Sequence, residues 1–125
     1  MEQHTLDSHG LRILVCASTG AQLSSERDAN DFMSAAWEHD ATWVAFPVSR
    51  LADGFFQLST RIAGDVIQKF VNHGLGIAIV GDISAWLADS KALRDFVYEA
   101  NRGKTVMFVS DLDELDRRIG ARAAG

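Results

Sequence analysis

The sequence predicts an α/β fold, a two-layer sandwich in which a mixed four- to five-stranded sheet packs against about four helices. Short runs of branched apolar residues alternate with stretches whose apolar residues recur at helical spacing, in the order β-β-α-β-α-β-α-β-α. Strands joined through a helix run parallel, and right-handed crossovers place such helices against the sheet. The chain has 125 residues, the length of one domain, and we expect a single domain over 1–125.

The chain begins with a predicted hairpin. Residues 4–6 and 11–17 form its strands, and residues 8–10, which include a glycine, form the turn. A helix then runs from residue 24 to about residue 39, and either of the two serines at its start can cap it. Apolar residues at helical spacing define its inner face: Ala29, Phe32, Met33, Ala36 and Trp37.

The middle of the chain continues with a strand at 42–46. Pro47 cannot donate a ladder hydrogen bond, so it marks either an edge strand or the end of a strand. Ser59 is expected to cap the next helix, which ends near residue 73. Gly74 follows, and glycine readily adopts the left-handed conformation that closes a helix.

The C-terminal part repeats the alternation. Residues 76–81 are continuously apolar, which is typical of a central strand covered on both faces. Ser90 precedes a helix that ends at 101–103, and residues 105–110 form the last strand. Asp111, with Glu114 three residues later, resembles a capping box that opens the final helix.

Composition and charge exclude several classes of function. The net charge of −5 argues against a nucleic-acid partner, because nucleic-acid binders carry basic patches. No apolar run approaches the ~20 residues that span a bilayer, so we expect no membrane partner. Residues 1–4 lack the features of a secretion signal, and a single cysteine, Cys16, suits a reducing compartment. We therefore expect a cytoplasmic protein.

Motifs for cofactors and metals are incomplete. Gly103-Lys104-Thr105 resembles the end of a phosphate-binding loop, but Tyr98 stands where that loop needs a glycine. The triplet also leads into a strand, whereas a phosphate-binding loop opens a helix. The four histidines lack metal-site spacing, and Cys16 reads as a small core side chain. We expect no cofactor and no metal.

Polar residues follow two of the predicted parallel strands. Asp82 and Ser84 come after the strand at 76–81, and Ser110 and Asp111 come after the last strand. The carboxyl ends of parallel strands form one rim, where ligands tend to bind. Two carboxylates there could bind a cation or act as an acid/base pair. Alternatively, Asp82 terminates a strand and Asp111 caps a helix.

A second group of residues precedes the second predicted helix. Phe55 and Phe56 either anchor the loop in the core or expose an aromatic contact surface. Ser59 and Thr60 present hydroxyls at a helix N-terminus, where a phosphate group would be stabilised. Capping alone also explains Ser59. These four residues are the candidate interaction or phosphorylation site.

Three long blocks, residues 54–72, 76–84 and 90–103, resemble the sequence of DUF4180, a bacterial family known only as a domain of unknown function. The family reads Lys-Thr-Gly where this chain has Ser59-Thr60-Arg61, so the resemblance favours Thr60 over Ser59. The predicted order of elements is also similar to that of STAS domains, found in anti-sigma-factor antagonists. Those domains carry a phosphorylatable Ser or Thr where the second helix begins, although this chain lacks their Asp-Ser-Ser-Gly motif.

These observations favour a small non-catalytic regulatory module that binds a partner protein through the region of Phe55 and Phe56. The alternative is a small-molecule-binding protein or enzyme that uses the rim. Asn101 and Arg102 are also candidates for the rim, but we expect both at the opposite end of the sheet. A third hypothesis is a homodimer that pairs through an edge strand such as the one that contains Pro47.

Overall fold

The computed structural model describes residues 3–124, except for the side chains of residues 123 and 124. The strands and α-helices follow in the order β1 (His4–Ser8), β2 (Leu11–Val15), α1 (Ala29–Glu38), β3 (Trp43–Pro47), α2 (Ile62–Asn72), β4 (Gly76–Val80), α3 (Ser84–Asp89), α4 (Lys91–Arg102), β5 (Val106–Val109) and α5 (Leu112–Ala124). Three single turns of 3₁₀ helix, Val48–Arg50, Asp53–Phe56 and Leu58–Thr60, connect β3 to α2.

The strands form one five-stranded mixed sheet in the order β1-β2-β3-β4-β5. β1 is antiparallel to β2, and every other pair is parallel, so the predicted α/β fold is confirmed. Because β3 lies inside the sheet, Pro47 ends a strand, where it is in register with Val80. The expectation of an edge strand at Pro47, and of a homodimer paired through it, is therefore wrong.

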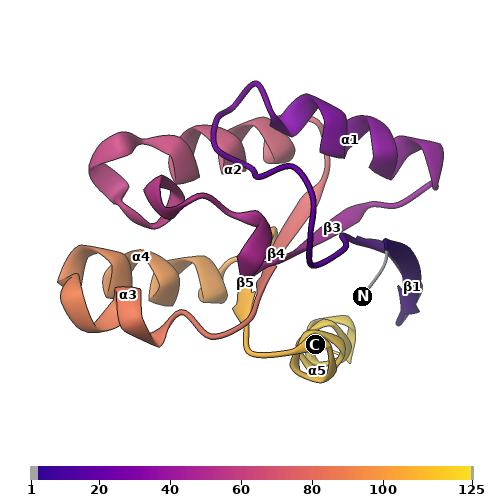
Figure 1. Ribbon diagram of the computed structural model, residues 1–125. Helices are drawn as coiled ribbons and strands as arrows, with labels where there is room; N and C mark the ends of the chain where they lie inside the picture. The colour runs from indigo at the N-terminus through magenta and orange to yellow at the C-terminus, as the bar shows by residue number, and fades with distance from the viewer. Residues whose placement is uncertain (1–2, 125) are drawn as a thin grey trace.

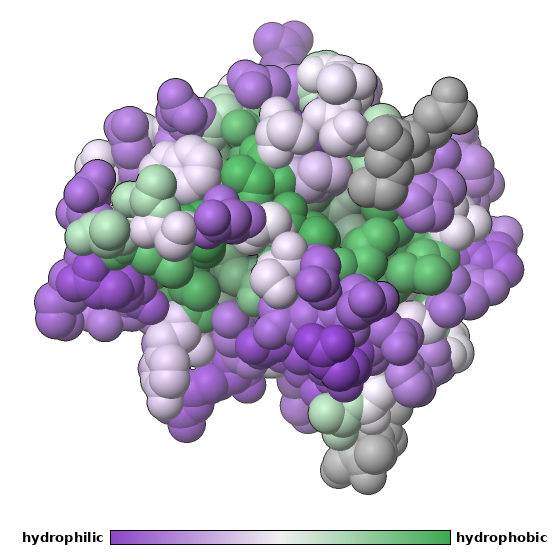
Figure 2. All heavy atoms as spheres, turned by 60° about the horizontal axis from the view of Figure 1, so that its bottom comes forward, coloured by the Kyte–Doolittle hydropathy of each residue, from purple (hydrophilic) through white to green (hydrophobic). Residues whose placement is uncertain are grey.

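Most helices pack on one face of the sheet, as Figure 1 shows, and α5 alone packs on the other. Side chains alternate between the two faces along each strand. In β3, for example, Val44 and Phe46 face the helices α1, α2 and α4, whereas Trp43 and Ala45 face α5. Leu115 and Ile119 are the buried residues that α5 contributes. Figure 2 shows the α5 side of the molecule, where hydrophobic residues lie between hydrophilic ones.

Several local predictions were wrong. The helix α1 begins at Ala29, because a turn in which the Ser25 hydroxyl accepts the Asp28 N–H precedes it. Trp37 was assigned to the inner face of α1, but it is 48% exposed and its ring lies 5.9 Å from that of His73. The six-residue helix α3 was not predicted at all.

Two further local predictions, the helix start after Ser90 and the closing glycine after the second predicted helix, are confirmed. Ser90 caps α4, since its hydroxyl accepts the N–H of Leu93 at 3.1 Å. Gly74 has a φ of 76°, the left-handed conformation expected just after α2. No helix among residues 3–124 is both long enough and apolar enough to cross a membrane.

Candidate functional site

The phenylalanine pair is part of the core. Phe55 is 1% exposed and Phe56 is 3% exposed, and the ring of Phe56 stacks on Trp86 with 4.4 Å between ring centroids. The 3₁₀ turn at Asp53–Phe56 folds both rings inward. An exposed contact surface at Phe55 and Phe56 is therefore wrong, and the structure supports the alternative, in which they anchor the loop.

Ser59 does not cap α2. Arg61 is the residue before α2, with a left-handed φ of 64°, and Ser59 lies exposed in the preceding 3₁₀ turn. The Thr60 hydroxyl accepts the N–H of Ile62 at 3.3 Å and lies 2.7 Å from the carbonyl oxygens of Gly54 and Gln57. Thr60 thus ties the turn together, and a phosphate on its oxygen would have to displace these contacts.

The rim residues border a hollow at the carboxyl ends of β4 and β5. This hollow, which we call the rim pocket, has a volume of about 410 Å³. Three of the four predicted residues line it, namely Asp82, Ser84 and Ser110. Asp111 lies beside it as the N-cap of α5, because its carboxylate accepts the N–H of Glu114 at 2.8 Å. Apolar side chains form its floor, among them Ile79, Leu87, Val97 and Phe108.

Asp82 is held in place by the chain that follows it. Its Oδ1 accepts the N–H of Ser84 at 2.9 Å, and hydrogen bonding from Ser84 lowers the pKa of Asp82 below its ordinary value. Gly81 makes the turn possible with a φ of 138°, where a Cβ would lie 2.8 Å from the Val48 side chain. Asp82 is therefore an exposed, ionised carboxylate at neutral pH.

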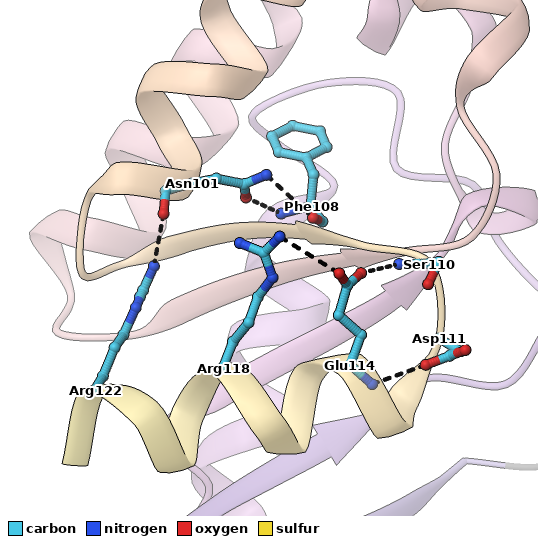
Figure 3. A network of polar contacts seen from close by, with 7 residues as sticks. All are labelled: Asn101, Phe108, Ser110, Asp111, Glu114, Arg118 and Arg122. Atoms are coloured by element: carbon cyan, nitrogen blue, oxygen red, sulfur yellow. Dashed lines mark hydrogen bonds and ion pairs between the residues drawn. The ribbon is translucent and has the colours of Figure 1, made fainter. Parts of the chain in front are cut away.

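Glu114 and Arg118 of α5 complete the charged part of the rim pocket. Figure 3 shows Glu114 between Ser110 and Arg118: Oε1 accepts the Ser110 N–H at 2.6 Å, and Oε2 lies 3.4 Å from Arg118 Nη2. The Ser110 hydrogen bond, and to a lesser degree Arg118, lowers the pKa of Glu114. Sequence reasoning assigned Glu114 to capping only and missed Arg118. The spacing of four residues between them on α5 was the available signal.

Asn101 also lines the rim pocket, contrary to expectation. Its side-chain amide pairs with the edge strand β5, because Oδ1 accepts the Phe108 N–H at 2.7 Å and Nδ2 donates to the Phe108 carbonyl at 3.3 Å (Figure 3). The side chain thus replaces a neighbouring strand at this position. Arg102, the next residue, lies at the other end of β5 as expected.

The carboxylates of the rim pocket are held in their ionised form. Its charged lining residues within the described chain are Asp82, Glu114 and Arg118, and the pKa of each carboxylate is lowered. A general acid or base needs a pKa near neutrality, which is a shift in the opposite direction.

Cys16 is buried in the core, and burial raises its pKa to about 11, against a smaller lowering by Arg50. Among the described residues, no group of three or more His, Cys, Asp or Glu is placed to hold a metal ion.

The fold and the rim pocket define a small α/β protein with a polar hollow at the carboxyl ends of its parallel strands. The chain belongs to the DUF4180 family, a domain of unknown function, whose family model matches residues 8–119. This match confirms the resemblance seen in the three sequence blocks. No curated protein and no solved structure matches the chain, and the similarity to STAS domains stays a prediction.

Proposed function

We propose that the protein is a non-catalytic binding module of the bacterial cytoplasm, which takes a small polar molecule with an ammonium group in the rim pocket. The observation that carries the proposal is the convergence of Asp82 and Glu114, two carboxylates that remain ionised at neutral pH, on one hollow with an apolar floor. A few fixed polar groups over an apolar lining are typical of small-molecule sites.

The charges of the rim pocket favour a cationic or zwitterionic ligand. Two carboxylates face a single guanidinium, that of Arg118, which Glu114 already contacts. Asp82 is the more available acceptor for an ammonium group, because it is exposed and, among the described residues, it forms no ion pair, whereas Glu114 pairs with Arg118. The hydroxyls of Ser84 and Ser110 supply further hydrogen bonds to a polar ligand.

Calorimetric titration with 1,4-diaminobutane, a set of free amino acids and the neutral 1,4-butanediol tests this function. We expect an ammonium-bearing probe to bind and the diol to bind more weakly. Asp82→Asn keeps an oxygen for the Ser84 N–H but removes the charge, so it should weaken binding about two- to fivefold, the range of an exposed ion pair. Asp89→Asn, at the exposed end of α3, is the matched control and should change nothing. Equal binding of the diol, or no effect of Asp82→Asn, would contradict the proposal.

A second candidate function, protein recognition, is favoured by a different surface. Trp37 is 48% exposed and Val71 is 37% exposed, at the ends of α1 and α2. The Trp37 ring packs on His73, which follows α2. The helices α1 and α2 are in contact, and large apolar side chains left exposed on neighbouring elements are typical of contact surfaces. For the regulatory-module hypothesis, we therefore place the contact with a partner protein at this surface instead of at the buried Phe55 and Phe56.

Cross-linking in cells tests the second candidate. A partner bound at this surface should be lost from Trp37→Gln and retained by Tyr98→Gln, which changes another exposed aromatic residue, on α4. Loss with both variants, or with neither, would exclude this surface. A homodimer that pairs strand to strand would have to use β1 or β5, the edges of the sheet, and Asn101 already occupies part of the β5 edge.

A further inference from the structure

We propose that the protein has a second ligand site, at the opposite end of the sheet from the rim pocket, which binds an amphipathic anion. This site, the basic pocket, is a hollow of about 580 Å³ between the starts of β2, β3 and β5 and the later turns of α5. It shares no lining residue with the rim pocket. Its volume lies in the range of sites for small organic molecules.

The floor of the basic pocket is apolar. It is formed by Trp43 at the start of β3, Met107 in β5 and Ile119 in α5, all of which are buried. The Trp43 ring lies against Gly76 of β4, where a Cβ would come within 2.2 Å of it. The glycine therefore sets the position of the indole, and an apolar body of a ligand would rest on these side chains.

The charged residues that line the basic pocket are all basic: Arg102, Lys104 and Arg122, with His9 at the edge. This is a local reversal in a chain whose net charge is −5. Glu99, outside the lining, offsets part of the charge, since it lies 3.7 Å from Arg102. The His9 ring lies 3.6 Å from the Asp116 carboxylate. Lys104 forms no ion pair with the described residues, so its charge remains available.

Arg122 gives the main evidence that the ligand of the basic pocket is an anion. Its Nη2 donates to the main-chain oxygen of Asn101 at 3.2 Å, as Figure 3 shows, and this bond ties α5 to the end of α4. Its Nη1 is buried and has no hydrogen-bond partner among the described residues. Burial, and then the neighbouring Arg118, lowers the pKa of Arg122. The bond from Nη2 fulfils the structural role and leaves Nη1 as a donor without a partner. Arg122 lines the basic pocket, and a turn of its guanidinium toward the pocket would let an anionic oxygen satisfy this donor.

These features together define the ligand class as a molecule with a carboxylate or phosphate group on an apolar body. The anionic group would lie at Arg122 and Lys104, and the apolar body would lie on Trp43 and Met107. Both head groups share the same recognition chemistry, because a guanidinium and an ammonium donate to either. The inference is independent of the ligand proposed for the rim pocket.

The test is calorimetric titration of the full chain with three probes that share one apolar body: 1-naphthaleneacetate, 1-naphthyl phosphate and the neutral 1-naphthaleneacetamide. We expect at least one anion to bind about tenfold more tightly than the amide, as loss of a charge-assisted hydrogen bond implies. The tighter of the two anions identifies the head group. No binding of either anion at millimolar concentration, or equal binding of the amide, would overturn the proposal.

Matched variants locate the site. Arg122→Gln should weaken anion binding about tenfold, whereas Arg117→Gln, an exposed arginine of the same helix, should leave it unchanged. Lys104→Gln is a second variant, and it leaves the contact between Arg122 and Asn101 intact. It should also weaken anion binding, and it keeps the test decisive if Arg122→Gln does not fold. Anion binding that survives both substitutions would place the anion elsewhere and overturn the assignment. Asp82→Asn should have no effect on it.

Discussion

The two faces of the sheet are covered very differently. On one face, α1, α2 and α4 bury large aromatic side chains, including Phe32, Phe46 and Phe70, whose rings pack edge to face. On the other face, α5 alone packs over a sheet whose central strands carry Ala45 and Ala78. Both hollows border α5, the rim pocket near its start and the basic pocket near its end. The large aromatic side chains are thus concentrated on the first face. The basic pocket lies beside the single helix of the second face, and the rim pocket lies between α5 and the apolar side chains of the first face.

The largest expected effect comes from the aromatic face. Phe70 is fully buried and its ring lies 5.8 Å from that of Phe46, so Phe70→Ala should lower the free energy of unfolding by about 3–5 kcal/mol. Urea denaturation followed by circular dichroism measures it. Val71→Ala, the adjacent and exposed position, is the control and should cost much less. Similar losses in the two variants would contradict the placement of the core.

On the α5 face, Gly76→Ala tests the packing of Trp43. The added Cβ would lie 2.2 Å from the indole ring, so the ring must move, at a cost of about 1–3 kcal/mol. In a background with Trp37→Phe and Trp86→Phe, which leaves Trp43 as the single tryptophan, the emission spectrum should change together with the free energy of unfolding. Gly64→Ala, in α2, is the control, since nothing lies within 4 Å of its Cβ and alanine is the better helix former. An unchanged emission spectrum in Gly76→Ala would show that the indole does not rest on Gly76.

The edge of β5 depends on one side chain. Asn101→Ala removes both hydrogen bonds to the Phe108 main chain, and we expect a loss of about 1–2 kcal/mol. The amide of Phe108 should also exchange with solvent much faster, which hydrogen exchange detected by NMR resolves. Asn30→Ala, at an exposed position of α1, serves as the control. If the Phe108 amide keeps its protection in Asn101→Ala, the pairing seen in Figure 3 does not protect this edge.

Local rules were sufficient to predict the order of the strands and of every α-helix except α3, because such rules depend on neighbours in the sequence. The cap at Ser90 and the glycine after α2 are examples, as each requires only residues within one turn. The rule that a serine before a helix caps it failed at Ser59. Consecutive 3₁₀ turns there bury the preceding phenylalanines and bring Thr60 to the start of α2. No local pattern indicates that α1 leaves Trp37 exposed.

The candidate site was harder to predict than the fold, since its residues meet only in three dimensions. The rim residues were found because carboxyl ends of parallel strands converge, a rule of topology. Asn101 was misplaced because its side chain bridges to Phe108 across a turn, over seven residues. The basic pocket combines residues from β2, β3, β5 and α5, which are far apart in the sequence. Nothing in the sequence distinguishes Arg122 from the other arginines, because its Nη1 is buried without a described partner only in the folded chain.

The smallest expected effect is on how stability declines at acidic pH. It distinguishes Glu114, near the start of α5, from Arg122, near the end of the same helix. The pKa of Glu114 is lowered in the folded state, so this group stabilises the fold above its unfolded pKa. That contribution is lost as the pH falls below about 5, through the ordinary range of glutamate. Glu114→Gln should therefore reduce stability at pH 7 and flatten its decline between about pH 5 and pH 3. Thermal melts at several pH values measure this.

The control for this prediction is Glu26→Gln, an exposed residue before α1, which should leave the slope as it is. At the other end of α5, Arg122 stays protonated throughout this range, so Arg122→Gln should change stability equally at pH 7 and pH 4. A slope unchanged in Glu114→Gln would mean that the Ser110 hydrogen bond does not hold the carboxylate in its charged form. The rim pocket would then lose one of the two fixed negative charges on which the proposed ammonium ligand depends.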